Sequence, residues 1–331
     1  MAELASVFQI VNFASEGTAG TQGTATKTFA ALAATPGINV DVKTYRPTGH
    51  LNPTVSVLGK EWSETDFSGP LTYTEAQFLL AGHYAKPSGG TPTIPSGGTS
   101  SRYWLIGFSD TAAGTTATYT LDQGDATRAH RTVYNVIDAF NYDVSRDEIK
   151  VGAHAIGQKV TDNIVMAASP TALALQPVAP TEVTVYLDTA SGSLGTTALT
   201  RLFSASYKSS GRYKPEWVVG TANASWVAPI DAAPSKSFTA MVEADANGMN
   251  LLGHLRGGTT LFVRVEGKGP AIEAGTITYL FRHDIALRLT DVAKWSDQDG
   301  VYAIEFTGTP VYDSGWGKAE QFELINTVTA L

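Results

Sequence analysis

The sequence predicts a mainly β protein built from two tandem copies of one module, each a β-sandwich or rolled sheet with a short flanking helix. Three observations predict it: a long alternating segment near the C-terminus, a similar segment in the first half, and a composition poor in charge. In the first segment, from Ile277 to Leu289, every second side chain is large and apolar except His283. Side chains of a strand alternate between its faces, so one face is expected on a core and the other in water.

The second alternating segment runs from Val133 to Ser145. Subtracting 145 from the later residue numbers aligns the two segments without gaps and places His283 on Asp138, the polar interruption of each apolar row. Each half also contains a similar helix-like string, Leu79–His83 in the first and Leu251–His254 in the second. We interpret the chain as an internal duplication.

Composition agrees with a β protein and excludes some functions. The chain has 331 residues, enough for two domains, with 16% charged residues and 32 glycines. It has no cysteine, which excludes disulfides, thiolate metal sites and cysteine nucleophiles. The formal net charge of −8 argues against a protein that binds nucleic acid through its phosphates.

Composition shifts predict four segments: an N-terminal assembly arm at 1–36, a first module at 37–160, a linker at 161–180, and a second module at 181–331 that includes a C-terminal tail. The arm is rich in Gly and Thr, so it is either disordered or ordered against a neighbouring subunit. The tail contains Trp316, Phe322 and Leu324 and must be covered by its own domain or by a neighbour.

Two helices are expected, one from Tyr73 to Tyr84 with Thr74 as its N-cap, and one from Asp245 to Leu255. His83 and His254 would lie at the ends of these helices, where an imidazolium favours exposed carbonyl groups. His283 and Asp138 are expected to be hydrogen-bonded or at an interface.

The sequence shows no catalytic, cofactor-binding or metal-binding pattern, and we expect no enzyme activity. It has neither His-Glu-x-x-His nor Gly-x-Ser-x-Gly. The carboxylate pairs Asp143 with Asp147 and Asp297 with Asp299 lie near expected hairpin turns, where Asp bonds the local backbone. No apolar run reaches the roughly 18 residues of a membrane helix, so no membrane partner is expected.

Four groups of short motifs carry a family resemblance. They are Phe8-Gln-Ile with Glu16-Gly-Thr-Ala19; Tyr45-Arg-Pro-Thr-Gly49 with Glu61-Trp62, Gly69 and Tyr73; Tyr119-Thr-Leu-Asp-Gln-Gly-Asp125 leading into Tyr134-Asn-Val-Ile-Asp138 and Ser145-Arg-Asp147; and Trp316-Gly-Lys-Ala-Glu-Gln-Phe322. In the order of these motifs, nearly the whole chain resembles the major tail proteins, the tail tube subunits, of siphovirus-type bacteriophages.

The resemblance implies a structural virion protein that assembles into stacked rings, trimeric and pseudo-sixfold for a duplicated chain. Its partners would be itself, the tape measure, tail terminator and distal tail proteins, and phage DNA that passes through the lumen without specific binding. The protein would be made in the host bacterial cytoplasm and reside in the virion. Asp138, Asp143 and Asp284 are candidates for luminal charges that would repel phosphate.

Two other classes remain open: a virion decoration protein, or a two-domain β-sandwich adhesin or binding module. A β-sandwich hydrolase is a third reading, and it requires a cluster of acid and base groups that the sequence does not display. If the tube reading holds, deleting residues 1–36 is expected to leave folded modules that polymerise poorly.

Overall fold

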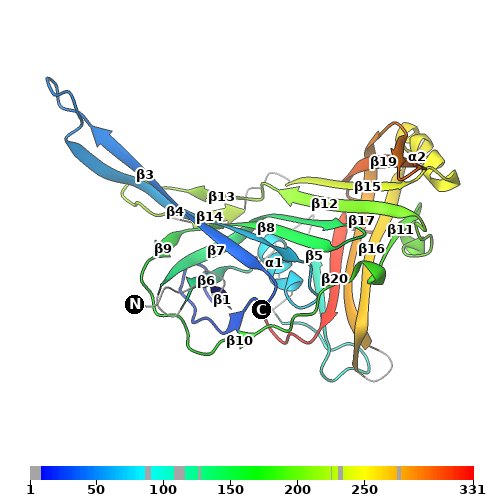
Figure 1. Cartoon of the computed structure of the whole chain (residues 1–331), viewed down its shortest axis with the longest axis horizontal. Coiled ribbons are helices and arrows are strands. Elements are labelled where there is room, and N and C mark those ends of the chain that lie inside the picture. Colours follow the sequence, from blue (N-terminus) through cyan, green and yellow to red (C-terminus); the bar gives the residue numbers. More distant parts are fainter. Residues whose placement is uncertain are drawn as a thin grey trace.

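The computed structural model describes residues 9–85, 91–107, 116–125, 128–224, 226–229, 234–273 and 277–331. The protein is mainly β, as the sequence predicts, with two α-helices in the described part, α1 (Ala76–His83) and α2 (Ala246–Gly257) (Figure 1). The strands of residues 9–172 are β1 (Ile10–Ser15), β2 (Lys27–Thr28), β3 (Ala33–Tyr45), β4 (Val55–Pro70), β5 (Arg102–Gly107), β6 (Tyr119–Gly124), β7 (Ala129–Val144), β8 (Ile149–Gly157), β9 (Lys159–Thr161) and β10 (Thr171–Ala172). The later strands are β11 (Val183–Asp188), β12 (Leu202–Ser210), β13 (Tyr213–Glu216), β14 (Trp226–Pro229), β15 (Ser235–Glu243), β16 (Thr260–Glu273), β17 (Ile277–Val292), β18 (Ser296–Gln298), β19 (Val301–Pro310) and β20 (Glu320–Asn326).

The two halves of the chain pair their strands in a similar order. In the first half the antiparallel neighbours run β3, β4, β8, β7, β6, β1. In the second half they run β12, β15, β19, β17, β16, β11. A helix follows the second strand of each series along the chain, α1 after β4 and α2 after β15. Helix α1 packs on β7 and α2 on β17.

The two series join in one continuous sheet through a seam between β7 and β12. These strands are antiparallel, from Ala205 opposite Val144 to Ser209 opposite Phe140. A second junction comes from β20, which pairs with β17 on one edge and with β5 on the other. The apolar tail is therefore covered by its own chain, and both Phe322 and Leu324 are buried.

Strand β17 confirms one expected face and corrects the other. Phe281, Ile285 and Leu287 are buried on the core side, as the alternation predicts. The opposite face is in water only near the end of the strand, where Arg288 and Thr290 are exposed, because Asp284 and Ala286 on that face are buried. Arg264 of β16 forms an ion pair with Asp284, so this polar residue of the alternation marks a buried ion pair rather than solvent.

The two long strands align in sequence without gaps, but their pairing with neighbouring strands differs at the aligned positions Asp138 and His283. The register of β7 with β8 shifts between Ile137 and Ala139, so Asp138 is an extra residue at a bulge, whereas His283 lies in an unbroken run of pairs. The bulge turns Val136 away from the core that contains Phe140, into a small separate cluster. The sequence shows only which residues alternate, and a bulge exchanges the two faces for every residue beyond it.

The structure differs from the expected N-terminal arm at 1–36. Residues 10–15 form β1 inside the sheet, and Phe13 is buried and stacked on Phe29 at 4.0 Å between ring centres. The buried carboxylate of Glu16 accepts hydrogen bonds from Gly20 N, Thr118 Oγ1, Thr120 Oγ1 and Tyr134 N. These bonds fix the Gly/Thr stretch, so residues 10–36 belong to the folded body, while residues 1–8 lie outside the described part.

The expected linker at 161–180 is also packed rather than free. Its strand β10 pairs in parallel with β2, and Leu173 and Val178 are buried. Val178 N donates to Leu71 O at 2.8 Å, which ties this segment to the chain just before α1. Backbone hydrogen bonds of this kind carry no sequence signal.

Helix α1 begins later than expected and is not capped by Thr74. The N-cap position is Glu75, which makes no capping bond; Thr74 Oγ1 donates to Ala174 O instead. The Glu75 carboxylate accepts the backbone N–H groups of residues 30–32 at 2.5–3.2 Å. Helix α2 agrees with the prediction, and Asp245 Oδ1 accepts Gly248 N at its start.

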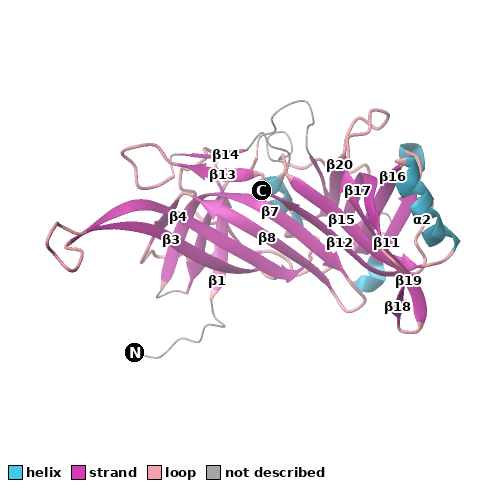
Figure 2. Ribbon diagram, turned by 90° about the horizontal axis from the view of Figure 1, so that it is seen from above, coloured by secondary structure: helices cyan, strands magenta, loops and turns pink. Residues whose placement is uncertain are grey.

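The outer parts of β3 and β4 form a two-stranded ribbon that projects from the body (Figures 1 and 2). Their pairing extends to Tyr45 opposite Val55. β4 pairs with β8 only from Ser63 to Pro70 and contacts residues 222–223 at Glu61 through an isolated bridge, so within the described residues no third strand pairs with the ribbon beyond that point. An isolated two-stranded ribbon is marginal in water, which makes its surface relevant to function.

Candidate functional site

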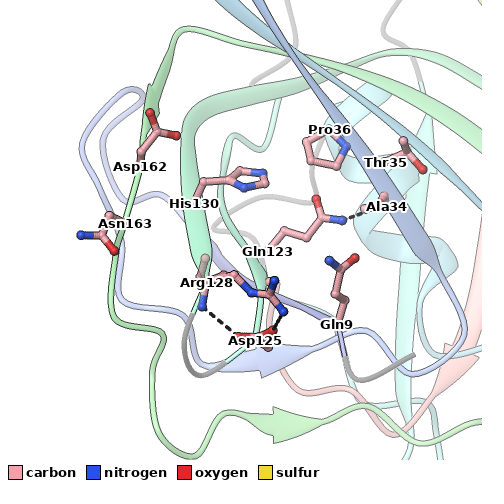
Figure 3. Close-up of a pocket in the computed structure, with 12 residues that line it drawn as sticks. Gln9, Ala34, Thr35, Pro36, Gln123, Asp125, Arg128, His130, Asp162 and Asn163 are labelled. Atoms are coloured by element: carbon pink, nitrogen blue, oxygen red, sulfur yellow. Dashed lines mark hydrogen bonds and ion pairs between the residues drawn. The ribbon is translucent and has the colours of Figure 1, made fainter. Parts of the chain in front are cut away.

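A cavity with a volume of about 680 Å³ opens beside β6 and β7 (Figure 3). Its polar side chains bond within the chain: Gln123 Nε2 donates to Ala34 O, and the Arg128 guanidinium lies 3.5 Å from Asp125. His130, Asp162 and Asn163 line the wall. Among the residues drawn, no nucleophile lies beside a base, so this geometry does not support catalysis.

His83 lies in the core and not at an exposed helix end, which corrects the expectation for it. The ring is fully buried; Nδ1 donates to Ile137 O at 2.9 Å and Nε2 accepts from Ser209 Oγ at 2.8 Å. Burial lowers the pKa of His83 to about 3, and Arg212 acts in the same direction against the Ile137 bond. The ring is therefore a neutral bridge between α1, β7 and β12. His254 in α2 is half-buried.

His283 is buried and hydrogen-bonded, as expected, and it belongs to a polar cluster at the seam. Its Nδ1 lies 2.9 Å from Tyr142 Oη, and its ring stacks on Phe322 at 3.7 Å. Glu320 lies 3.4 Å from its Nε2, forms an ion pair with Lys236 at 2.5 Å and accepts the Tyr207 hydroxyl.

The carboxylate of Glu320 stays ionised in this cluster. Burial alone would raise the pKa of Glu320, but Lys236 and His283 outweigh it and lower the pKa to about 2. Burial lowers the pKa of His283 and raises that of Tyr142 and Tyr207 well above the ordinary value. The group has an acid–base composition, but Tyr142, Tyr207, His283 and Glu320 are all buried, and Lys236 is half-buried beside them.

The carboxylate pairs lie at turns, as the sequence predicts. Asp297 Oδ1 accepts Gly300 N in the turn from β18 to β19, and Asp299 has a φ of +54° there. Asp143 and Asp147 flank the turn from β7 to β8 and are exposed. Arg146 of this turn lies 3.1 Å from Asp299, which brings the two turns together.

The three proposed luminal carboxylates have different surroundings. Asp143 is exposed, Asp138 is half-buried and accepts Tyr213 N, and Asp284 is buried with a bidentate ion pair to Arg264 at 2.7 and 2.9 Å. Of the three, only Asp143 is exposed to solvent. Within the described residues no group of three His, Asp or Glu side chains could hold a metal ion, and no helix could span a membrane.

Two unpaired strand edges are the most distinctive surfaces. One edge of β3 pairs with β4, and across the described residues no strand pairs with its other edge. β16 pairs with β17 only as far as Thr260 opposite Arg288, so the last residues of β17 lack a strand partner on that side within the described ranges. The unpaired N–H and C=O groups at a strand edge can form hydrogen bonds with a strand of another chain.

The ribbon next to the β3 edge has an exposed apolar row made of Ile38, Val40, Val42 and Leu58, each about half exposed. The row continues the core-facing side of β3, since Ala34 at the same parity is buried opposite Phe67. The alternation of Val40 and Val42 was visible in the sequence, but exposure of the row was not. We call these four residues the apolar row. The apolar row, the unpaired edge of β3 and the unpaired edge at the end of β17 together form the candidate assembly surface.

No family model matches the sequence, and no curated protein matches it.

Proposed function

We propose that this protein is a self-assembling structural subunit of a phage tail tube, made of two tandem tail-tube-like modules. The observation that carries the proposal is the seam between β7 and β12, where one series of strands is continued by the next within a single chain. A sheet built this way ends in an open edge at each end, and further copies can extend it. The sequence motifs support the same family.

The two strand series support the tandem part of the proposal. Strand order and helix position agree between the halves, while the loops differ, and β5 has no counterpart between α2 and β16. Three such chains would present six similar units around a ring. Closing the sheet into a ring removes its edges and with them the tendency to aggregate.

The absence of chemistry among the described side chains suits a structural role. The cavity lacks a catalytic arrangement, and the titratable cluster at the seam is in the core. In the proposed virion the subunit contacts itself and the tape measure, terminator and distal tail proteins. DNA would pass a lumen kept from binding phosphate by the net charge of −8.

Assembly of the purified protein tests the proposal. Sedimentation velocity over a wide concentration range, followed by negative-stain electron microscopy, is expected to show rings or tubes with a central hole that grow with concentration. A single species of constant small size at every concentration would contradict it. Binding of that species to a capsid or a glycan would favour the decoration protein or the adhesin.

A further inference from the structure

We infer that β3 of one copy pairs antiparallel with the end of β17 of a second copy, Leu289–Val292, and that the apolar row of the first copy packs beneath α2 of the second. The inference rests on the proposed function, because it names the contact through which the subunits join. It commits the candidate assembly surface to one occupant, a second copy of this chain.

The seam inside the chain is the template for this contact. β12 opens the second series as β3 opens the first, and β12 pairs with the end of β7, the strand in the place that β17 occupies in the second series. β6 pairs with one edge of β7 only as far as Asn135, and β12 pairs with the later residues of that same edge. β16 leaves the corresponding edge of β17 after Arg288. The first series therefore has its neighbour inside the chain, and the second lacks one.

Helix α1 shows what covers an added strand. Its last residue, His83, bonds Ser209 of β12, and Tyr84 Oη lies 2.6 Å from Tyr207 Oη on the same strand. Every residue of α1 is buried. In α2, by contrast, Met249 is 49% exposed and Leu252 is 41% exposed. These side chains, three apart on one helix face, offer an apolar cover that has nothing to cover in the single chain.

The apolar row needs such a cover. Val40 and Val42 lie on the side of the sheet that faces the core at Ala34, but the ribbon has left the body where they occur. Adding β3 to the neighbour's sheet would keep that side facing inward, as Ala205 and Tyr207 do at the seam, where they lie opposite Val144 and Tyr142. Burial of these exposed apolar side chains would remove apolar surface from water and so would favour the contact.

The contact is head-to-tail. The ribbon and α2 lie at opposite ends of the molecule in both views (Figures 1 and 2). Different surfaces meet, so repetition closes a ring or continues as a filament and does not stop at a symmetric dimer.

Introduced cysteines test the pairing directly, because the chain has none of its own. The outer side of β3 carries Thr35, Asn39, Asp41 and Lys43, and the bulge places Asp291 on the outer side of β17, opposite Thr307. Directly opposite residues lie within disulfide distance. D291C combined with one of T35C, N39C, D41C or K43C is expected to give a ladder of linked chains on a non-reducing gel after mild oxidation.

Matched variants define the controls. V40C with D291C puts the two thiols on opposite faces and is expected to give no ladder, and each single cysteine variant should stay monomeric on the gel. Efficient dimers from N39C or D41C alone would show β3 pairing with β3 and would overturn the inference. Assembled protein in which none of the four double variants cross-links would overturn it as well.

A charge in the apolar row supplies a second readout. V40D is expected to raise the concentration needed for assembly at least tenfold, with the circular dichroism spectrum and the melting temperature of the unassembled chain unchanged. V165D, at another exposed valine that is 87% exposed, should assemble as the parent does. If V40D assembles as the parent does, the inferred contact is wrong but the proposed function stands. If the parent itself does not assemble, both the proposed function and the inferred contact are wrong.

Discussion

At the scale of single residues, the seam is held by polar groups that are fully enclosed. His83 spans α1, β7 and β12 as a neutral ring, and the charge of Glu320 is balanced by Lys236. Buried polar groups of this kind are stabilising only when every partner is in place. His83 does lie at the end of α1, as the sequence indicated, but neither its burial nor a role for Glu320 was predictable, because the partners lie up to 126 positions away.

The first prediction concerns acid. The pKa of His83 in the folded protein is about 3, below its ordinary value near 6.5, so the unfolded chain takes up a proton first as the pH falls. The contribution of the neutral His83 ring to the free energy of unfolding is therefore complete above about pH 6.5 and is lost as the pH drops towards 3. For this one proton the free energy of unfolding falls by up to about 1.4 kcal/mol per pH unit. Urea unfolding between pH 7.5 and 4.5 measures that slope.

His83→Gln is expected to reduce the dependence of the unfolding free energy on pH by the amount that corresponds to about one proton. This holds even if the substitution lowers the stability at neutral pH. His50→Gln, at an exposed histidine, should leave the slope as it was. An identical slope in the parent and H83Q would show that His83 is not held neutral.

At the scale of elements, the long alternating strands were predictable and the seam strand was not. β17 has large apolar residues at every second position from Ile277 to Leu289 except His283, a pattern that no helix explains. β12 reads Leu-Phe-Ser-Ala-Ser-Tyr-Lys-Ser-Ser, with small and polar residues, and becomes a strand because β7 and β15 pair with its two edges. Tertiary pairing of that sort overrides a weak local pattern. The bulge at Asp138 was invisible for the same reason.

The second prediction tests the core face of β17. Phe281→Ala removes a ring that is 1% exposed and packs against Tyr142 and Phe322. The free energy of unfolding should fall by about 3–5 kcal/mol, as for other large-to-small changes in a core. Tyr302→Ala, at a residue 69% exposed, is the control and should change it by less than about 0.5 kcal/mol. Equal losses from both, measured by chemical denaturation, would refute the assigned faces.

At the scale of the whole molecule, the N-terminal segment is part of the body, which reverses the expected effect of truncation. Deletion of residues 1–36 removes β1, β2 and the stacked pair Phe13 and Phe29, and exposes Phe78 beneath them. The truncated chain is expected to lose its cooperative thermal transition, monitored by circular dichroism. Deletion of residues 1–8 alone is the control and should keep the transition. A folded chain lacking residues 1–36 that fails only to polymerise would restore the assembly arm.

The seam between β7 and β12 has a consequence for how tightly the chain holds together on dilution. The two strands belong to one polypeptide, so they meet at an effective concentration in the millimolar range whatever the amount of protein in solution. Dilution can separate only contacts between different chains. A closed assembly of these subunits would thus form half of its similar joints during folding of the individual chains, and would need less than half as many bimolecular encounters as one built from separate halves.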